Sequence, residues 1–232
     1  MARSTAKTNT NQPHTKGGAP MNSPSSSLLG RLRSLTPARG NLTFDEALRI
    51  AELQAAHLVA TLSGCNELHE VSIGSIPRIQ VVHEPLSVSG MSHWTGATWL
   101  IVINAHDSRA RQRFTLLHEF KHIVDHGRAA QLYRTTLRAS AALQAERAAD
   151  YFAGCALVPK RDLKALWGAG VQRVTDLAHH FGVSVDAIVV RLAQTKLNST
   201  DGLPTARCAR PISSPLDGPQ HFRIVETPRS CS

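Results

Sequence analysis

The ten residues RFTLLHEFKH, numbered 113–122, contain two histidines four positions apart, with a glutamate directly after the first of them. On an α-helix, side chains four positions apart lie on one face, so the imidazoles of His118 and His122 can reach a single metal ion. Neutral imidazole is a common ligand of Zn²⁺, and Glu119 stands beside such a metal, where it can accept a proton from a water molecule. The stretch predicts a helix over about residues 108–127 that carries a catalytic metal centre.

The motif alone has a simpler explanation, a histidine-rich helix end stabilised near Gly127 by the partial negative charge of the helix C-terminus. A catalytic zinc site needs three protein ligands and one open position, so a third ligand decides between the two interpretations. The long metzincin pattern is absent, because Asp125 and Arg128 occupy the positions of its glycine and its third histidine. Glu146, on the next expected helix, is the better candidate, and Asp150 four residues later shares its face.

Glu146 and Asp150 suit complementary tasks in such a site. Glu146 would bind the metal, and Asp150 would accept the free N–H of a ligating histidine and so fix its tautomer. A glutamate on a solvated helix face is the alternative interpretation, but small or apolar residues surround Glu146 in the sequence. These neighbours are Ala145, Ala148, Ala149, Phe152 and Ala153.

The linked motifs resemble those of a known family. Residues 113–122, followed by His126, are similar to the RFTLAHELGH…H signature of the ImmA/IrrE family of metallopeptidases, and residues 146–153 with 157–159 resemble its E-x-E-A-N-x-F-A…L-x-P segment. The similarity covers about residues 44–195 and leaves both tails outside. It implies a bacterial, cytoplasmic, zinc-dependent endopeptidase of gluzincin type that cleaves a partner transcriptional repressor and so derepresses genes.

The resemblance also assigns roles to single residues. His118, His122 and Glu146 would be the metal ligands, with Zn²⁺ expected and Mn²⁺ as the alternative, and Glu119 would be the general base. The chain departs from the family pattern at Lys121, where glycine is usual. Lys121 either points outward from the helix or places its ammonium where it lowers the basicity of Glu119.

The expected reaction also needs a donor for the oxyanion that forms when water attacks a peptide carbonyl. The sequence leaves four candidates open for this role, namely Tyr133, Tyr151, His179 and His180. His126 continues the histidine stripe by one turn, but it lies too far along the helix to bind the same metal.

Several further helices are expected outside this motif. Thr43 and Glu46 have the spacing of a capping box, which opens a helix that Gly64 ends. Later in the chain, residues 139–158 form a helix that the following proline terminates, and residues 160–167 form a shorter one.

Between the first helix and the histidine motif, the pattern changes to short β-like runs over residues 71–103. The clearest of these runs are residues 79–83 and 98–104. Turn-forming residues between them suggest a hairpin or an irregular sheet edge. These residues are Gly90, Ser92 and Gly96.

Residues 174–181 and 184–192 are predicted to be two helices around a tight turn at Gly182, with the spacing of a helix-turn-helix. A DNA-reading second helix presents Arg, Lys, Asn or Gln to base edges. The second helix offers few polar side chains, namely Ser184, Asp186 and Arg191. Direct DNA binding is therefore not favoured, and the resemblance suggests that the segment helps to hold the repressor.

These elements predict an α+β fold: a mainly helical, zincin-like peptidase core with a small β-sheet, followed by a helix-turn-helix-like segment. The expected organisation has four parts. They are a disordered basic tail (1–40), a zinc metallopeptidase domain (41–165), a helix-turn-helix-like helical segment (166–197) and a disordered Pro/Ser-rich tail (198–232).

The formal net charge of +9, from 26 Lys and Arg against 17 Asp and Glu, invites a nucleic-acid partner. The distribution of the charge weakens that inference. Residues 1–40 hold six basic residues and no acidic one, whereas residues 41–197 hold 16 basic and 14 acidic residues. Most of the excess therefore belongs to the N-terminal tail and not to the expected peptidase core.

The four cysteines are widely spaced, which indicates free thiols in a reducing compartment. The apolar run at residues 99–103 is far shorter than the roughly 20 residues that span a bilayer. The N-terminus lacks the apolar segment of a signal peptide. The cytoplasm is therefore the expected location, with no membrane partner.

The sequence supports the hypothesis that the protein is a zinc-dependent endopeptidase with a specific protein substrate. A transcriptional repressor is the favoured substrate. The alternative is a DNA-binding or scaffolding regulator with a vestigial peptidase site, which the helix-turn-helix and the basic tail favour. A general aminopeptidase or housekeeping protease is a third hypothesis, and it would turn over short unstructured peptides. Metal analysis separates the first two, because the regulator would lack stoichiometric zinc and would bind DNA in a salt-sensitive manner.

Overall fold

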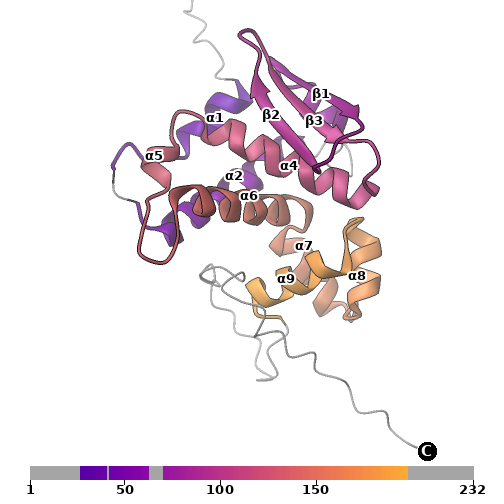
Figure 1. Cartoon of the computed structure of the whole chain (residues 1–232). Helices are drawn as coiled ribbons and strands as arrows, with labels where there is room; N and C mark the ends of the chain where they lie inside the picture. Colours follow the sequence, from indigo (N-terminus) through magenta and orange to yellow (C-terminus); the bar gives the residue numbers. More distant parts are fainter. Residues whose placement is uncertain (1–26, 41, 63–69, 198–232) are drawn as a thin grey trace, which may run out of the picture.

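The computed structural model describes residues 27–40, 42–62 and 70–197, which form a mainly helical molecule with one small sheet (Figure 1). This confirms the expected α+β fold class. The helices are α1 (Leu28–Ser34), α2 (Phe44–Leu62), α3 (Glu70–Gly74), α4 (Arg109–Asp125), α5 (Ala129–Leu132), α6 (Ala141–Leu157), α7 (Lys160–Gly168), α8 (Val174–Phe181) and α9 (Val185–Thr195). The strands are β1 (Ile79–Glu84), β2 (Gly90–Trp94) and β3 (Trp99–Asn104). Within the described ranges, no helix is long and apolar enough to cross a lipid bilayer.

The sheet has the strand order β1-β3-β2, so β2 lies at one edge. β1 and β3 are parallel and pair Ile79 with Trp99, whereas β2 and β3 are antiparallel and pair Trp94 with Trp99. Figure 1 shows α4 running beneath the sheet. The strand residues Ile101 and Ile103 are buried in the core on that side. The region expected to be a hairpin or an irregular edge is therefore a regular hairpin, and its edge strand β2 lies against α4.

Helix α4 begins after Ser108, whose hydroxyl accepts a hydrogen bond from the backbone N–H of Arg111 at 3.3 Å. Such an N-cap satisfies a backbone donor that the first helical turn would leave unpaired. The apolar side chains of α4 recur at steps of three and four residues and are buried. They are Leu116, Leu117, Phe120, Ile123 and Val124. Each burial contributes roughly 1.5–3 kcal/mol, so α4 is held firmly in the core with its histidine stripe on the remaining side.

Helix α6 packs against α2 and α4. Its N-cap is Ser140, whose hydroxyl accepts a hydrogen bond from the backbone N–H of Leu143 at 3.1 Å. The small buried side chain of Ala148 lets the helices approach closely, and the rings of Phe120 and Phe152 meet with their centroids 6.3 Å apart. This packing places the acidic face of α6 next to the histidine stripe of α4.

Helix α2 begins with the capping box that the sequence predicts. The hydroxyl of Thr43 accepts a hydrogen bond from the backbone N–H of Glu46 at 3.2 Å, and the Glu46 carboxylate accepts one from the backbone N–H of Thr43 at 2.8 Å. The Glu46 carboxylate accepts hydrogen bonds from both the backbone N–H and the hydroxyl of Thr43, and these two bonds lower the pKa of Glu46. The expected helix stop at Gly64 lies outside the described residues, while α6 and α7 confirm the helices expected at 139–158 and 160–167.

The last two helices form the predicted pair, with Gly182 between them in the left-handed conformation at φ +60°. Ser184 caps α9 by accepting a hydrogen bond from the backbone N–H of Ala187 at 3.2 Å. Arg113 of α4 donates from Nη1 to the carbonyl oxygens of Phe181 and Gly182, at 3.1 and 2.9 Å. Because the C-terminus of α8 carries partial negative charge, this guanidinium fastens the helix pair to α4.

The prediction of a disordered tail over residues 1–40 is wrong for the C-terminal part of that range. Helix α1 lies within that range, and its Leu28 and Leu32 are buried in the core. Ser27 caps this helix by accepting a hydrogen bond from the backbone N–H of Gly30 at 3.1 Å. The sequence pattern does not predict α1 because the helix is short and directly follows a serine-rich stretch.

Two other expectations differ from the structure or lie beyond it. Residues 70–74 form helix α3, although the sequence pattern favours β-like structure from residue 71. The expected tails at residues 1–26 and 198–232 lie outside the described residues, and the proposed domain boundaries stay predictions.

Candidate metal centre

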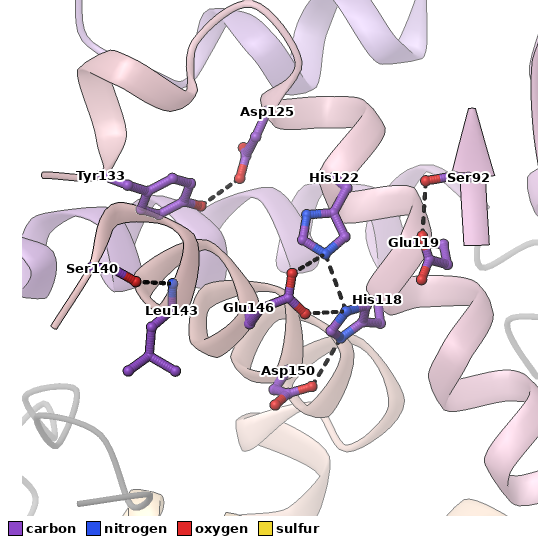
Figure 2. Close-up of polar contacts among 10 residues, drawn as sticks. All are labelled: Ser92, His118, Glu119, His122, Asp125, Tyr133, Ser140, Leu143, Glu146 and Asp150. Atoms are coloured by element: carbon purple, nitrogen blue, oxygen red, sulfur yellow. Dashed lines mark hydrogen bonds and ion pairs between the residues drawn. The ribbon is translucent and has the colours of Figure 1, made fainter. Parts of the chain in front are cut away.

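Three side chains from two helices converge on one point (Figure 2). His118 Nε2 lies 3.1 Å from His122 Nε2 and 3.2 Å from Glu146 Oε2. Glu146 Oε1 lies 3.4 Å from His122 Nε2. The histidines stand one turn apart on α4 and Glu146 stands on α6, so the packing of these two helices assembles the group.

These spacings fit a single metal ion. Zn²⁺ binds histidine nitrogen at about 2.0–2.1 Å and carboxylate oxygen at about 2.0–2.2 Å, so ligand atoms around a tetrahedral ion lie about 3.4 Å apart. The observed spacings of 3.1, 3.2 and 3.4 Å are close to that value. Two imidazole nitrogens and one carboxylate also leave a fourth position for water, as in catalytic zinc sites.

Asp150 holds the opposite edge of the His118 ring. Its Oδ1 lies 2.9 Å from His118 Nδ1, an arrangement in which Nδ1–H donates to the carboxylate and Nε2 keeps its lone pair for the metal position. Burial by itself lowers the pKa of His118. The hydrogen bond and charge of Asp150, together with the charges of Glu119 and Glu146, outweigh burial and raise this pKa above its ordinary value.

Glu119 lies beside the three converging side chains and does not belong to their group (Figure 2). Its Oε2 accepts a hydrogen bond from the hydroxyl of Ser92 at 2.8 Å. From its residue type alone, Ser92 is predicted only to be a turn-forming residue. Ser92 alternates with Gly90 and Trp94 along β2, and this period of two is the signal that could have placed its side chain on the face turned to α4.

The site borders a cleft of about 910 Å³. Helices α2, α4, α6 and α9 and the start of β2 contribute to its walls. The part contributed by α9 is a stripe at helical spacing, consisting of Asp186, Ala187, Val190, Arg191 and Gln194. Because the side chain of Glu146 is 57% exposed, the converging ligand atoms are accessible to a molecule in this cleft.

Lys121 behaves differently from both alternatives that the sequence left open. It is fully buried, faces away from Glu119 on α4, and places Nζ 2.5 Å from Asp125 Oδ1. The hydroxyl of Tyr133 donates to the other carboxylate oxygen of Asp125, also at 2.5 Å. Burial lowers the pKa of Lys121, and the charge of Asp125 opposes this shift. Lys121 is therefore half of an enclosed ion pair, and the expectation that it points outward is wrong.

Of the four candidate oxyanion donors, Tyr151 alone lines the cleft. Its hydroxyl donates to Glu52 Oε2 at 3.3 Å, and burial raises its pKa. Tyr133 belongs to the enclosed cluster around Lys121, and His179 and His180 are exposed on α8 away from the cleft lining. The structure thus leaves Tyr151 as the one of these four candidates that lines the cleft, but the hydroxyl of Tyr151 is hydrogen-bonded to Glu52 and is not a free donor at the metal position.

His126 stands apart from the three converging side chains. Its ring packs edge-on against Trp99, with the ring centroids 4.8 Å apart. Trp99 in turn contacts Trp94, at a centroid distance of 5.4 Å. The histidine stripe of α4 therefore ends in an aromatic contact beneath the β2–β3 hairpin.

A helix with two histidines one turn apart, a sheet edge lying along it and a glutamate from the next long helix define a zincin-like core. The chain belongs to the Peptidase_M78 family, the IrrE N-terminal-like domain, whose sequence model matches residues 77–193, half of the 232 residues. The matched range contains the sheet, α4 and α6, and with them the whole candidate centre. The family resemblance drawn from the linked motifs is thereby confirmed.

Among solved structures, the chain is similar to a Mycobacterium tuberculosis transcriptional regulator, with 17% sequence identity and a TM-score of 0.46. The similarity covers 72% of this chain and 51% of that one, so this chain spans about half the length of the regulator. A comparison with curated proteins gives no match.

Proposed function

We propose that this protein is a zinc-dependent endopeptidase that hydrolyses a peptide bond in a specific protein substrate. The observation that carries the proposal is the convergence of His118, His122 and Glu146 at zinc-ligand spacing, with Glu119 beside them and an open cleft alongside. Membership of a peptidase family supports the same class of reaction. The arrangement combines a group of three metal ligands, the carboxylate of Glu119, which is not needed as a ligand, and a cleft that can accept part of a polypeptide.

Each residue of the centre has a definite task in this proposal. His118, His122 and Glu146 would hold the zinc, and Asp150 would keep the His118 ring in the tautomer that offers Nε2. The bound metal supplies Lewis-acid polarisation of the scissile carbonyl and activation of a water molecule. Glu119 accepts the proton of the attacking water at its carboxylate and then delivers it to the nitrogen of the leaving amine.

Zinc is the metal that these donor atoms favour. Imidazole nitrogen suits Zn²⁺, whereas Mn²⁺ prefers carboxylate, carbonyl and water oxygens in octahedral sites. In the Irving–Williams order, Zn²⁺ also binds a given nitrogen and oxygen site more tightly than Mn²⁺ does. Mn²⁺ is therefore the alternative only where zinc is scarce.

The substrate in this proposal is a cytoplasmic transcriptional repressor, whose cleavage derepresses the genes that it silences. Support comes from the resemblance of the linked motifs to the ImmA/IrrE metallopeptidases. The cleft volume of about 910 Å³ lies within the roughly 300–1,000 Å³ of ligand pockets and leaves room for a short stretch of a substrate chain. Its walls carry both charges, including Arg111 and Asp186, which suits an extended peptide with mixed side chains.

The alternative function, a DNA-binding regulator with a vestigial peptidase site, has less support. Arg191, the basic residue within α9, is 2% exposed. Its Nε donates to the carbonyl of Val158 at 3.2 Å, and its Nη1 donates to Gln194 Oε1 at 2.8 Å. Because a reading helix needs exposed basic or amide side chains, α9 is better suited to forming a cleft wall than to reading bases.

Co-expression with candidate repressors tests the proposal, with Glu119→Gln as the matched control. We expect the wild-type chain to cleave one repressor, and Glu119→Gln to retain zinc but cleave at least about 100-fold more slowly, because it lacks the general base. His118→Ala should lose the metal itself. Undiminished cleavage by Glu119→Gln would contradict the mechanism. A zinc-free chain with salt-sensitive DNA affinity would favour the regulator, and turnover of short unstructured peptides would favour a general peptidase.

A further inference from the structure

Strand β2 and helix α4 run side by side and in step with each other. On β2, Gly90, Ser92 and Trp94 share the face turned to α4, because side chains alternate along a strand. Two strand residues advance about 6.6–6.8 Å and four helical residues about 6 Å, so the two elements keep nearly the same step. Successive members of this row can therefore contact successive turns of α4.

Gly90 begins the row opposite Thr115. A Cβ atom at this position would lie 2.5 Å from Thr115 Cγ2 and 2.9 Å from the carbonyl oxygen of Val102. Any larger residue would therefore push β2 away from α4. The glycine allows the strand to approach the helix closely enough for the next side chain in the row to make a short polar contact.

That contact joins Ser92 Oγ to Glu119 Oε2 at 2.8 Å. Figure 2 shows Ser92 reaching Glu119 from the side of β2, whereas His118, His122 and Glu146 lie on its other side. A hydroxyl that donates to a carboxylate forms a charge-assisted hydrogen bond, which is stronger than a bond between neutral groups. The bond holds one carboxylate oxygen and leaves the second oxygen for proton transfer.

Aromatic rings hold the far end of the row. Trp94 contacts Trp99 across the hairpin, and Trp99 contacts His126 on α4, with centroid distances of 5.4 and 4.8 Å. The close approach at Gly90 and these ring contacts fix β2 against α4 on both sides of Ser92. The serine hydroxyl is therefore carried by a rigid strand, which positions a polar group more accurately than a loop does.

From this geometry we infer that Ser92 is a positioning residue for Glu119. Its hydroxyl restricts the carboxylate to one rotamer and directs Oε1 toward the space in front of the metal ligands. Without this anchor, the partly exposed side chain of Glu119 would distribute over several staggered rotamers. The inference rests on the proposed function, in which Glu119 moves the proton, and it adds the edge strand β2 to a site that the sequence motifs confine to two helices.

An isosteric pair of substitutions tests this role. Ser92→Thr keeps the hydroxyl and adds a methyl group, whereas Ser92→Val has the shape of threonine with a second methyl group in place of the hydroxyl. The probe is acetohydroxamate, a zinc chelator whose acidic proton needs a nearby acceptor, titrated by calorimetry into the zinc-loaded protein. We expect Ser92→Val to weaken acetohydroxamate binding about tenfold, as for the loss of a hydrogen bond to a charged group, and Ser92→Thr to bind like the wild type.

Two further measurements separate positioning from a general structural effect. The zinc affinity of both variants, measured by competition with a chromophoric chelator, should equal that of the wild type, because Ser92 contacts none of the ligands. With a cleaved protein substrate, Ser92→Val should lower kcat about tenfold and leave KM unchanged, since the lost hydrogen bond acts on the base. Ser75→Ala, at an exposed serine whose hydroxyl donates to the carbonyl of Ser72, is the matched control and should change neither constant.

A double-mutant cycle decides whether Ser92 acts through Glu119. In the Glu119→Gln background, Ser92→Val should have no further effect on acetohydroxamate affinity. A tenfold effect that persists in this background, or equal affinities of Ser92→Val and the wild type, would overturn the inference. Failure of the proposed function gives a different result: the wild type binds no zinc, or Glu119→Gln leaves the acetohydroxamate affinity unchanged. Either result would overturn both the proposed function and the role of Ser92.

Discussion

Helix α4 carries two sets of polar side chains in opposite surroundings. His118, Glu119 and His122 are partly exposed and meet partners from α6 and β2. Lys121 and Asp125, on the same helix, form an ion pair with side-chain exposures of 1% and 7%. The first set opens on the cleft, and the second is enclosed in the core.

The difference shows two ways of accommodating polar groups in a folded chain. Buried polar groups must be paired, because an unpaired charge in the core is strongly destabilising. Lys121 and Tyr133 each occupy one carboxylate oxygen of Asp125, so that this set is internally complete. The exposed set instead supplies two of the three donor atoms that converge on one point with one side open, and Glu146 of α6 supplies the third. This is the arrangement that metal and substrate binding require.

Breaking the enclosed set should have the largest effect. Asp125→Ala leaves the Lys121 ammonium and the Tyr133 hydroxyl buried without their partner, so it should lower the free energy of unfolding by about 3–5 kcal/mol. Urea unfolding followed by circular dichroism measures the change. The triple substitution Lys121→Met, Asp125→Leu and Tyr133→Phe is the control, and it should recover most of the loss because no charge remains unpaired. A loss below about 1 kcal/mol, as for an exposed ion pair, would contradict the enclosed arrangement.

A smaller effect is expected on the open side. Asp150→Asn removes the carboxylate that orients His118, and such partners of ligating histidines contribute about 10- to 100-fold to metal affinity, or about 1.4–2.8 kcal/mol. The side chain of Asp150 is 42% exposed, so the unfolding free energy of the metal-free protein should fall by less than about 1 kcal/mol. Competition with a chromophoric chelator measures the zinc affinity. An unchanged affinity would show that Asp150 does not orient the ligand.

Arg33 of α1 tests whether the two sides of α4 are independent. Its Nη2 donates to the carbonyl of Ile123 at 2.7 Å and its Nε to the carbonyl of Val124 at 3.2 Å, at the C-terminal end of α4. Arg33→Gln should lower the unfolding free energy by about 1 kcal/mol, because it weakens these hydrogen bonds and removes a charge from the helix terminus. Zinc affinity should stay unchanged. A parallel loss of zinc affinity would show that the two sides are coupled.

The smallest effect concerns the pH dependence of the metal-free protein. Burial lowers the pKa of His118, but the hydrogen bond and charge of Asp150, together with the charges of Glu119 and Glu146, raise it above 6.5. The interaction therefore stabilises the folded state fully below pH 6.5 and is lost as the pH rises through the raised pKa. The melting temperature of the wild type should exceed that of Asp150→Asn by a margin that shrinks with rising pH. Thermal scans of both metal-free proteins over a range of pH measure this difference in melting temperature. A difference that does not depend on pH would contradict the role of Asp150 in raising the pKa of His118.

The candidate site could largely be predicted from the sequence because its chemistry imposes a regular spacing. Histidines four positions apart must share a helix face, and a carboxylate on the following helix supplies what the pair lacks. The structure brings His118, His122, Glu146 and Asp150 together at distances between 2.9 and 3.4 Å. Helix boundaries were also predictable where a cap such as Thr43 or a proline marks them.

The remaining features depend on contacts between elements that are distant in the sequence. Ser92 reaches Glu119 only because β2 pairs with β3 and lies along α4, which local periodicity does not specify. The burial of Lys121 depends likewise on Tyr133, which follows α5 and folds back against α4. Residue patterns identify the face of an element, but they do not identify which other element covers it.

The metal content of the purified chain tests the central claim most directly, that α4 and α6 together form a zinc centre. Native mass spectrometry after zinc reconstitution should show one zinc ion in the wild type, one in Glu119→Gln and none in His118→Ala. Circular dichroism should confirm that all three proteins are folded. A folded wild-type chain without zinc, or a His118→Ala chain that retains it, would contradict the claim.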